Sequence, residues 1–508
     1  MKNLVLRPLA CGAAIALLIP TTALADVTAL QVWEGWKSFA ENFGQTVSVG
    51  SQSVDGGALI LRDVRFTTAF PDGSAVAIMD LLEFRERGDG TVSVTLSEDF
   101  PLTVSVDPEI GEVVEMKIVL RQSGTSIIAS GEDDDITFDY LSSSIGLSLD
   151  SLVVDAVSIN PEVQVLLSGI DGQYALKTGD TKTYASQFAA EVVNIEFDVI
   201  DPEEGGRIAV SGSIEDIRSR SNTVVPADFD VNDTSSIFNS DFAVEGEFSA
   251  AGSGFKIDIL DGEDTTSLTT SSGGSAFGFR LGDCAIRYST SATEVQYDVL
   301  TTQLPLPTVT LSFAELAFDF LMPLGKSDEA KDFSFLTRIA GLEISNVLWS
   351  MFDPGEILPR EPATFVVDIA GQVKWLIDIT DPQQTAAFEA ENEGVNPGEM
   401  ESLTINELTL SAVGAEVTGA GMFTFDNTDL ETFDGFPAPT GVFDARLVGL
   451  NTLLDRLIEM GIASQDQAVG ARMMLGLFAR PADGEDTLTS TLEINGDGTI
   501  FANGQQLR

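Results

Sequence analysis

The sequence predicts a mainly β fold: one long antiparallel, amphipathic sheet, either curled into a groove or packed as a sandwich. Apolar and polar residues alternate through many segments, for example in Asn194–Val199, Phe255–Ile259 and Glu294–Val299. Strict alternation places apolar side chains on one face of a strand and polar ones on the other. The chain carries 79 Asp and Glu against 27 Lys and Arg, a net charge of −52, so the polar faces are mostly acidic. A sheet with one wet face is typical of antiparallel folds.

Turn dipeptides separate the alternating segments. Asp-Gly pairs stand at 55–56, 72–73, 89–90, 171–172 and 497–498, and they supply the positive φ of tight hairpins. Polar stretches at 228–241, 261–275 and 389–399 predict loops. We therefore expect one elongated β-rich domain over residues 26–508, with a possible internal joint within 226–275.

A helix is predicted at the start of this domain. Asp26 is a candidate N-cap and Gly44 a candidate end. Between them, apolar residues recur at helical spacing: Val27, Leu30, Trp33, Trp36, Phe39, Ala40 and Phe43.

Residues 446–508 predict a helical pair followed by a β-hairpin. The first helix ends at Gly461, and a capping box of Ser464 and Gln467 begins the second, which must end before Pro481. The short connection makes the helices antiparallel neighbours. Their apolar stripes should therefore face each other: Leu450, Leu453, Leu454, Leu457 and Ile458 against Val469, Met473, Leu477 and Phe478. The hairpin, from Leu488 to Ala502, should join the edge of the main sheet.

Residues 1–25 resemble a secretory signal peptide. Lys2 and Arg7 precede an apolar run at 9–19, and Ala23-Leu24-Ala25 predicts cleavage between Ala25 and Asp26. An uncleaved anchor and a lipoprotein are the alternatives. No later segment reaches 18 consecutive apolar residues, so no transmembrane span is expected in the mature chain. The predicted location is the periplasm, with secretion as second choice.

The composition excludes several chemistries. There is no histidine, which removes Ser-His-Asp triads and His-ligated metal sites. The scarcity of basic residues argues against nucleic-acid binding. Cys284 is predicted to be a buried strand residue. We expect no cofactor and no enzymatic activity, although a site built from Asp, Glu, Ser or Lys alone would leave no recognisable spacing.

Acidic turns leave a second functional class open. Residues 132–135 and 261–264, and Asp426 with Asp429, could ligate calcium, as in a secreted adhesin or surface-layer protein. An outer-membrane β-barrel is less favoured, because its aromatic girdles need more than 4 Trp and 5 Tyr.

One segment differs in composition from the strands around it. Residues 348–363 hold a tryptophan, three prolines and an arginine. Proline fixes φ and cannot donate to a sheet, so the segment predicts a rigid connection. Its prominent residues, Trp349, Phe352, Asp353 and Arg360, form either a partner-docking loop or a structural corner with the aromatics in the core.

This segment carries a family resemblance. The pattern from Trp349 through Phe352-Asp353-Pro354 to Leu358-Pro359-Arg360 resembles an uncharacterised family of Gram-negative envelope proteins, catalogued as a domain of unknown function (DUF2125). The ending, with Gly449-Leu450-Asn451 and residues 497–504, is also similar to that family. The resemblance should cover most of the mature chain and implies no catalytic residue. More distantly, the pattern resembles AsmA-type envelope proteins, which implies a sheet curled around lipid.

These observations together favour an exported, periplasmic β-rich protein without enzymatic activity. The expected partner is a hydrophobic ligand such as a lipid, or another envelope protein.

Overall fold

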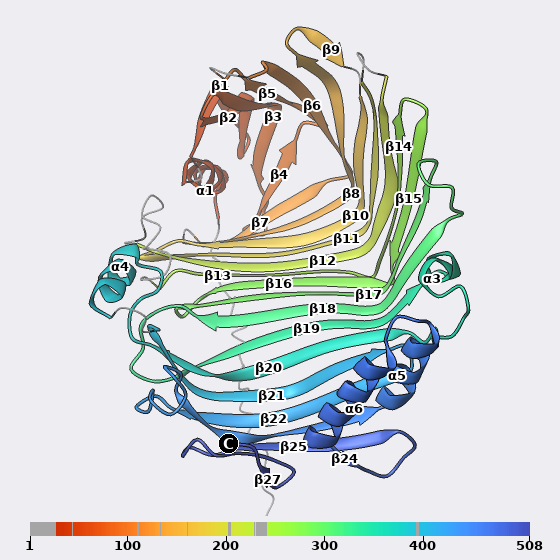
Figure 1. Cartoon of the computed structure of the whole chain (residues 1–508). Coiled ribbons are helices and arrows are strands. Elements are labelled where there is room, and N and C mark those ends of the chain that lie inside the picture. Colours follow the sequence, from red (N-terminus) through yellow and green to blue (C-terminus); the bar gives the residue numbers. More distant parts are fainter. Residues whose placement is uncertain are drawn as a thin grey trace, which may run out of the picture.

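The computed structural model describes residues 27–42, 44–108, 111–132, 134–159, 161–201, 205–227, 229, 241–392 and 396–508. Its 27 described strands form one antiparallel sheet with a helix near the start and a helical pair near the end (Figure 1). The predicted fold class is confirmed. Each strand pairs mainly with its neighbours along the chain, as short hairpin turns require. The predicted signal peptide and its cleavage site, Ala25 and Asp26, lie outside the described residues.

The N-terminal part of the sheet curls around a helix, α1 (Figure 1). This helix spans Ala29–Asn42. The strands of this half are β1 Gln45–Asp55, β2 Ala58–Phe70, β3 Gly73–Glu86, β4 Val92–Leu96, β5 Asp99–Val106, β6 Val114–Ser123, β7 Ser126–Glu132, β8 Asp135–Val154, β9 Val157–Ile159, β10 Glu162–Lys177, β11 Thr181–Ile200 and β12 Arg207–Pro226.

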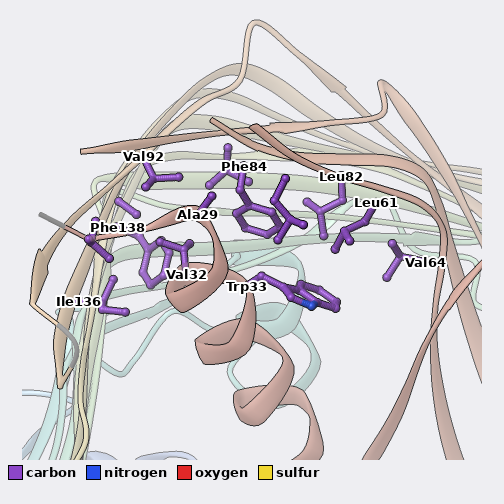
Figure 2. Close-up of a cluster of buried hydrophobic side chains, with 14 residues drawn as sticks. Ala29, Val32, Trp33, Leu61, Val64, Leu82, Phe84, Val92, Ile136 and Phe138 are labelled. Atoms are coloured by element: carbon purple, nitrogen blue, oxygen red, sulfur yellow. The ribbon is translucent and has the colours of Figure 1, made fainter. Parts of the chain in front are cut away.

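Helix α1 fills the curl with a closed apolar core (Figure 2). Trp33 is 3% exposed and packs against Phe84 of β3, which is fully buried. Trp36 bridges Phe84 and Phe138 of β8. The predicted helix is confirmed, but its predicted stripe is wrong at Leu30, which is 54% exposed. The helical spacing of apolar residues between Val27 and Trp33 did not show whether Leu30 or Val32 enters the core. In the structure Val32 is the buried residue.

A line of left-handed residues crosses the sheet from strand to strand. Positive φ occurs inside or between strands at Asp63, Gly124, Gly169, Asp216, Glu294 and Gly341. The pairing register places these positions, and the residues that face them, in one transverse row from β1 to β19. We call this row the crease. A left-handed residue in a strand interrupts the ladder and bends the strand. The long strands turn sharply at the crease, so each has two arms (Figure 1).

The apolar faces of the two arms meet on the inner side of this bend. Ile170, Ala190, Val193, Ile217 and Ala250 form a second buried cluster there, drawn from both sides of the crease. Helix α1 packs on the same face farther along the sheet, where the ring of Phe39 contacts Tyr174 of β10. We call it the inner face.

The remaining strands extend the sheet toward the C-terminus. They are β13 Ala243–Ala250, β14 Gly252–Asp261, β15 Asp264–Ser272, β16 Gly274–Gly282, β17 Ala285–Thr301, β18 Val309–Pro323, β19 Lys331–Ile344, β20 Ala363–Trp375, β21 Gly398–Ala412, β22 Ala415–Asp426, β23 Ala438–Val448, β24 Arg480–Pro481, β25 Thr487–Ile494, β26 Ile500–Ala502 and β27 Gln505–Gln506.

Several local predictions are wrong. Residues 261–275 were expected to form a loop but contain strand β15, whose Thr and Ser residues suit a strand. Asp171-Gly172 lies inside β10 rather than at a turn, and the ring of Tyr140 occupies the space where a Cβ of Gly172 would sit. Cys284 is exposed rather than buried, because Asp283 and Cys284 form the two-residue left-handed turn between β16 and β17. The joint within 226–275 stays a prediction.

The described residues form four further helices outside the sheet. They are α3 Asn346–Phe352, α4 Pro382–Glu391, α5 Leu450–Glu459 and α6 Gln465–Phe478. Helix α4 occupies the start of the 389–399 segment expected to be a loop, and its N-cap Asp381 accepts hydrogen bonds from the N–H groups of Gln383 and Gln384.

The C-terminal pair and hairpin are confirmed, and Ser464 and Gln467 form the predicted capping box. Helices α5 and α6 lie over the last strands (Figure 1). The expected facing of the two stripes is wrong. Met473 is 72% exposed and Val469 is also exposed, whereas Ala468 is fully buried. Ala468 is the buried residue of α6, and Met474, Leu475 and Phe478 line an apolar cavity shared with α5.

Candidate ligand-binding face

Between the two helical regions, the inner face of the sheet is apolar and uncovered by described helices. Strand alternation and register assign the inner-face residues of the central strands. They form successive rows, from β16 to β21: Phe277 and Phe279, Tyr288 and Thr290, Phe318 and Phe320, Phe335 and Thr337, Val367 and Ile369, Ile405 and Leu408. These rows join the N-terminal core to the strands under α5 and α6.

Aromatic rings run across this face from strand to strand. The ring centroids of Phe277 and Tyr288 lie 5.3 Å apart, those of Tyr288 and Phe318 5.8 Å, and those of Phe318 and Phe335 5.6 Å. All three pairs meet edge to face, the favoured arrangement for aromatic side chains. We call these four residues the aromatic row.

Charged side chains of the central strands lie almost entirely on the opposite, outer face. Along β16 to β23, the register places one charged side chain, Lys331 at the end of β19, on the inner face. The outer face carries the ion pairs, such as Arg287 with Asp319 at 2.9 Å and Arg338 with Glu407 at 3.1 Å. Apart from Lys331, the register therefore leaves the inner face of these strands free of fixed charge.

The inner face is also open. Phe277 is 40% exposed, Phe365 39% and Leu410 54%, all in sheet interiors where an apolar side chain is normally covered. A continuous exposed apolar patch on a soluble protein marks an interaction site.

Two tyrosine hydroxyls on the inner face, those of Tyr140 and Tyr174, are partly removed from water. Burial raises the pKa of the Tyr140 hydroxyl, and the nearby carboxylate of Asp171 raises it further. Burial also raises the pKa of Tyr174, whose hydroxyl has no hydrogen-bond partner among the described residues. The environment on this side therefore disfavours charge.

The residues predicted as a docking loop come together at one edge of this face. They lie in residues 345–360, which we call the corner loop. The rings of Trp349 and Phe352 are 4.8 Å apart, and the Arg360 guanidinium lies 5.9 Å from the Trp349 ring centre. The structural-corner alternative placed both aromatic rings in the core; Trp349 is buried, but Phe352 is 49% exposed.

Asp353 has a structural role in the corner loop. Its side chain is buried, and its carboxylate accepts hydrogen bonds from the N–H groups of Ile357 at 3.0 Å and Leu358 at 2.9 Å. This closes the turn after α3 and sets the position of the prolines that follow. The sequence predicted this loop, but the contact between Arg360 and the Trp349 ring could be recognised only in the folded structure.

A cavity of about 410 Å³, which we call the corner cavity, lies between the corner loop and the sheet. Its walls include Ser345, Asn346, Trp349 and Arg360 from the loop. Sequence reasoning missed Ser345 and Asn346, which carry no motif.

The predicted calcium turns serve as ordinary turns where they are described. Hydrogen bonds from Thr428 lower the pKa of Asp426, and hydrogen bonds from Thr432 lower that of Asp429, so both carboxylates already have partners. Asp133 lies outside the described residues. Within the described ranges, no group of three or more acidic or cysteine side chains is placed to share a metal ion.

The fold and this face define a class: an antiparallel β protein bent along a crease, with helices at both ends and an open apolar face between them. The chain belongs to a family of uncharacterised proteins conserved in bacteria, DUF2125, whose model matches residues 244–505. The match covers β13 to β27, a little more than half of the predicted mature chain, and leaves the N-terminal curl outside it. No comparison shows the more distant AsmA-type resemblance.

Other comparisons add little. The chain matches no curated protein. One solved structure, the ferric preacinetobactin receptor BauA from Acinetobacter baumannii, aligns with 90% of this chain and 76% of its own, at 8% identity and a TM-score of 0.13, too low to carry an argument. Among the described helices, none has the length and hydrophobicity to cross a membrane.

Proposed function

We propose that this protein is an exported, non-enzymatic periplasmic protein that holds the acyl chain of a lipid on the open inner face. The observation that carries the proposal is the partition of the sheet: charged side chains on one face, and aromatic and aliphatic side chains, partly exposed, on the other. The signal-like residues 1–25 and the absence of histidine support export and the lack of catalysis.

The dimensions of the face suit an acyl chain. The rows from β16 to β20 span four strand spacings, roughly 19 Å at ~4.8 Å each. The chains of one membrane leaflet extend over ~15 Å, half of a bilayer's hydrocarbon core. One extended chain therefore fits across these rows of the inner face.

A one-sided face predicts modest affinity. Each fully buried CH₂ contributes about 0.8 kcal/mol, and an open sheet covers about half of it. For twelve carbons the gain is roughly 5 kcal/mol, which corresponds to a dissociation constant on the order of 100 µM. A filled cavity would bind far more tightly.

A matched pair of variants on β17 tests the proposal. Thr290 lies on the inner face between Phe277 and Phe318, whereas the adjacent Ser291 points to the outer face. The full-length protein is incubated with vesicles of bacterial lipid, re-isolated and extracted, and bound acyl chains are quantified by mass spectrometry. Thr290→Glu should reduce retained lipid at least fivefold, and Ser291→Glu should not. Equal retention by both variants, or no lipid on the wild-type protein, would overturn the proposal.

A further inference from the structure

The corner cavity contains buried hydrogen-bond donors that the described chain leaves unpaired. The Nε and Nη2 groups of Arg360 and the Oγ of Ser345 are inaccessible to solvent and have no hydrogen-bond partner among the described residues. Only Nη1 of Arg360 is satisfied, by Asn346 Oδ1 at 2.6 Å. Glu356 lies 3.5 Å from Nη2, but its side chain is 75% exposed and makes no hydrogen bond there. Buried donors normally have an acceptor, so these groups indicate a missing one.

The cavity adjoins the open inner face. Ala363 and Ala412 line it, and by strand alternation they continue the inner-face positions of Phe365 on β20 and Leu410 on β21. Both neighbours are exposed apolar side chains. The corner loop also reaches the helical pair, because Pro359 and Arg456 of α5 both lie against Gly414 in the turn after β21. A ligand whose head lies in the cavity would therefore extend its chain over Phe365 and Leu410 of the inner face.

We propose that the corner cavity binds the monoanionic oxyacid head of the acyl-chain ligand, with Arg360 and Ser345 donating hydrogen bonds to its oxygens. This inference rests on the proposed function and names the class of amphiphile. A guanidinium offers parallel N–H groups that match the two oxygens of a carboxylate or a phosphodiester. The Trp349 ring and the Asn346 amide hold the guanidinium in place.

Nearby carboxylates limit the charge of that head group. Glu343 and Glu361 line the cavity and are exposed, and Glu356 lies beside Arg360. A single negative charge can pair with the one guanidinium. A doubly charged phosphomonoester would meet one cation and three acids, an arrangement that like-charge repulsion disfavours.

The test compares two ligands that differ only in the head. Equilibrium dialysis measures binding of radiolabelled dodecanoate and dodecanol to the full-length protein. Wild type should bind dodecanoate about tenfold more tightly than dodecanol, because hydrogen bonds to a charged group are the strong ones. Arg360→Gln should remove that preference and leave dodecanol binding unchanged. Arg338→Gln is the control, since Arg338 pairs with Glu407 on the outer face, and it should change neither.

A second variant covers the case in which Arg360→Gln does not fold. Ser345→Ala removes a hydroxyl without a protein partner and should weaken dodecanoate binding two- to threefold with no loss of thermal stability. If wild type binds the two ligands equally and both variants leave dodecanoate binding unchanged, the head-group inference fails while the acyl-chain face stands. If wild type binds neither ligand, the proposed function fails as well.

Discussion

The N-terminal curl and the central sheet are built from the same kind of alternating strand. The apolar face of the strands is covered in the curl and exposed in the central sheet. In the curl, α1 covers the apolar face, and Phe84 and Leu61 are fully buried. In the central sheet no described helix covers that face, and Phe277 and Leu410 are left exposed. An alternating strand thus becomes a core or an open surface according to what covers it. The family match begins at β13, so the open face and the corner loop lie inside it and the curl lies outside.

The largest expected effect comes from the same truncation in both regions. Phe84→Ala should lower the free energy of unfolding by about 3–5 kcal/mol, because it leaves a cavity in a closed core. Phe277→Ala should cost only about 1–2 kcal/mol, since its ring is already partly in water. Urea denaturation followed by circular dichroism measures both. Equal losses would mean that the central face is packed as tightly as the curl.

Part of this difference between the two regions could be predicted from the sequence. Alternation and Asp-Gly turns predict the antiparallel sheet, and the spacing of Trp33 and Trp36 predicts α1. The crease could not be predicted, because one left-handed Asp216 or Glu294 has no meaning until the register aligns it with its neighbours. Whether a side chain is exposed likewise depends on segments far away in the sequence. Met473 and Ala468 both fit a buried helical stripe, and only the position of α6 on the sheet determines that Ala468 is the buried one.

The C-terminal pair offers an intermediate case between core and open face. Leu454 and Met474 line an apolar cavity beneath α5 and α6, which also touches Leu447 of β23. Leu454→Asp should lower the free energy of unfolding by about 2–3 kcal/mol, since a carboxylate there has no partner. Met473→Asp, on the exposed side of α6, should change it by less than about 0.5 kcal/mol. Thermal melts of both variants provide the measurement; equal melting temperatures would show that the pair is not docked on the sheet.

The corner loop should be held by one carboxylate. Asp353→Ala leaves the part-buried N–H group of Ile357 and the buried N–H group of Leu358 unpaired and should cost about 1–3 kcal/mol. It should also weaken dodecanoate binding, because Arg360 loses its fixed position. Urea denaturation and the dialysis assay report the two effects. A variant as stable as wild type would exclude this role for Asp353.

The smallest effect concerns pH. Burial opposes ionisation of Asp486, but hydrogen bonds from Thr452 and Asn451 at the start of α5 outweigh it and lower its pKa below the usual 3.8. The charged form is favoured in the folded state, so its contribution is full above about pH 4 and is lost as the pH falls through the lowered pKa. Asp486→Asn should cost about 1 kcal/mol at pH 7, and the difference from wild type should shrink below pH 4. A difference that grows on acidification would contradict this assignment.

One measurement tests the openness of the central face and its ligand together. The photoreactive residue p-benzoylphenylalanine replaces Phe277 on the inner face, which is 40% exposed, or Met422, an even more exposed apolar residue on the outer face at 62%. After illumination with lipid vesicles, the account predicts lipid adducts by mass spectrometry at position 277 and none at position 422. Adducts at 422 alone, or equal labelling at both positions, would contradict an inner face that holds acyl chains.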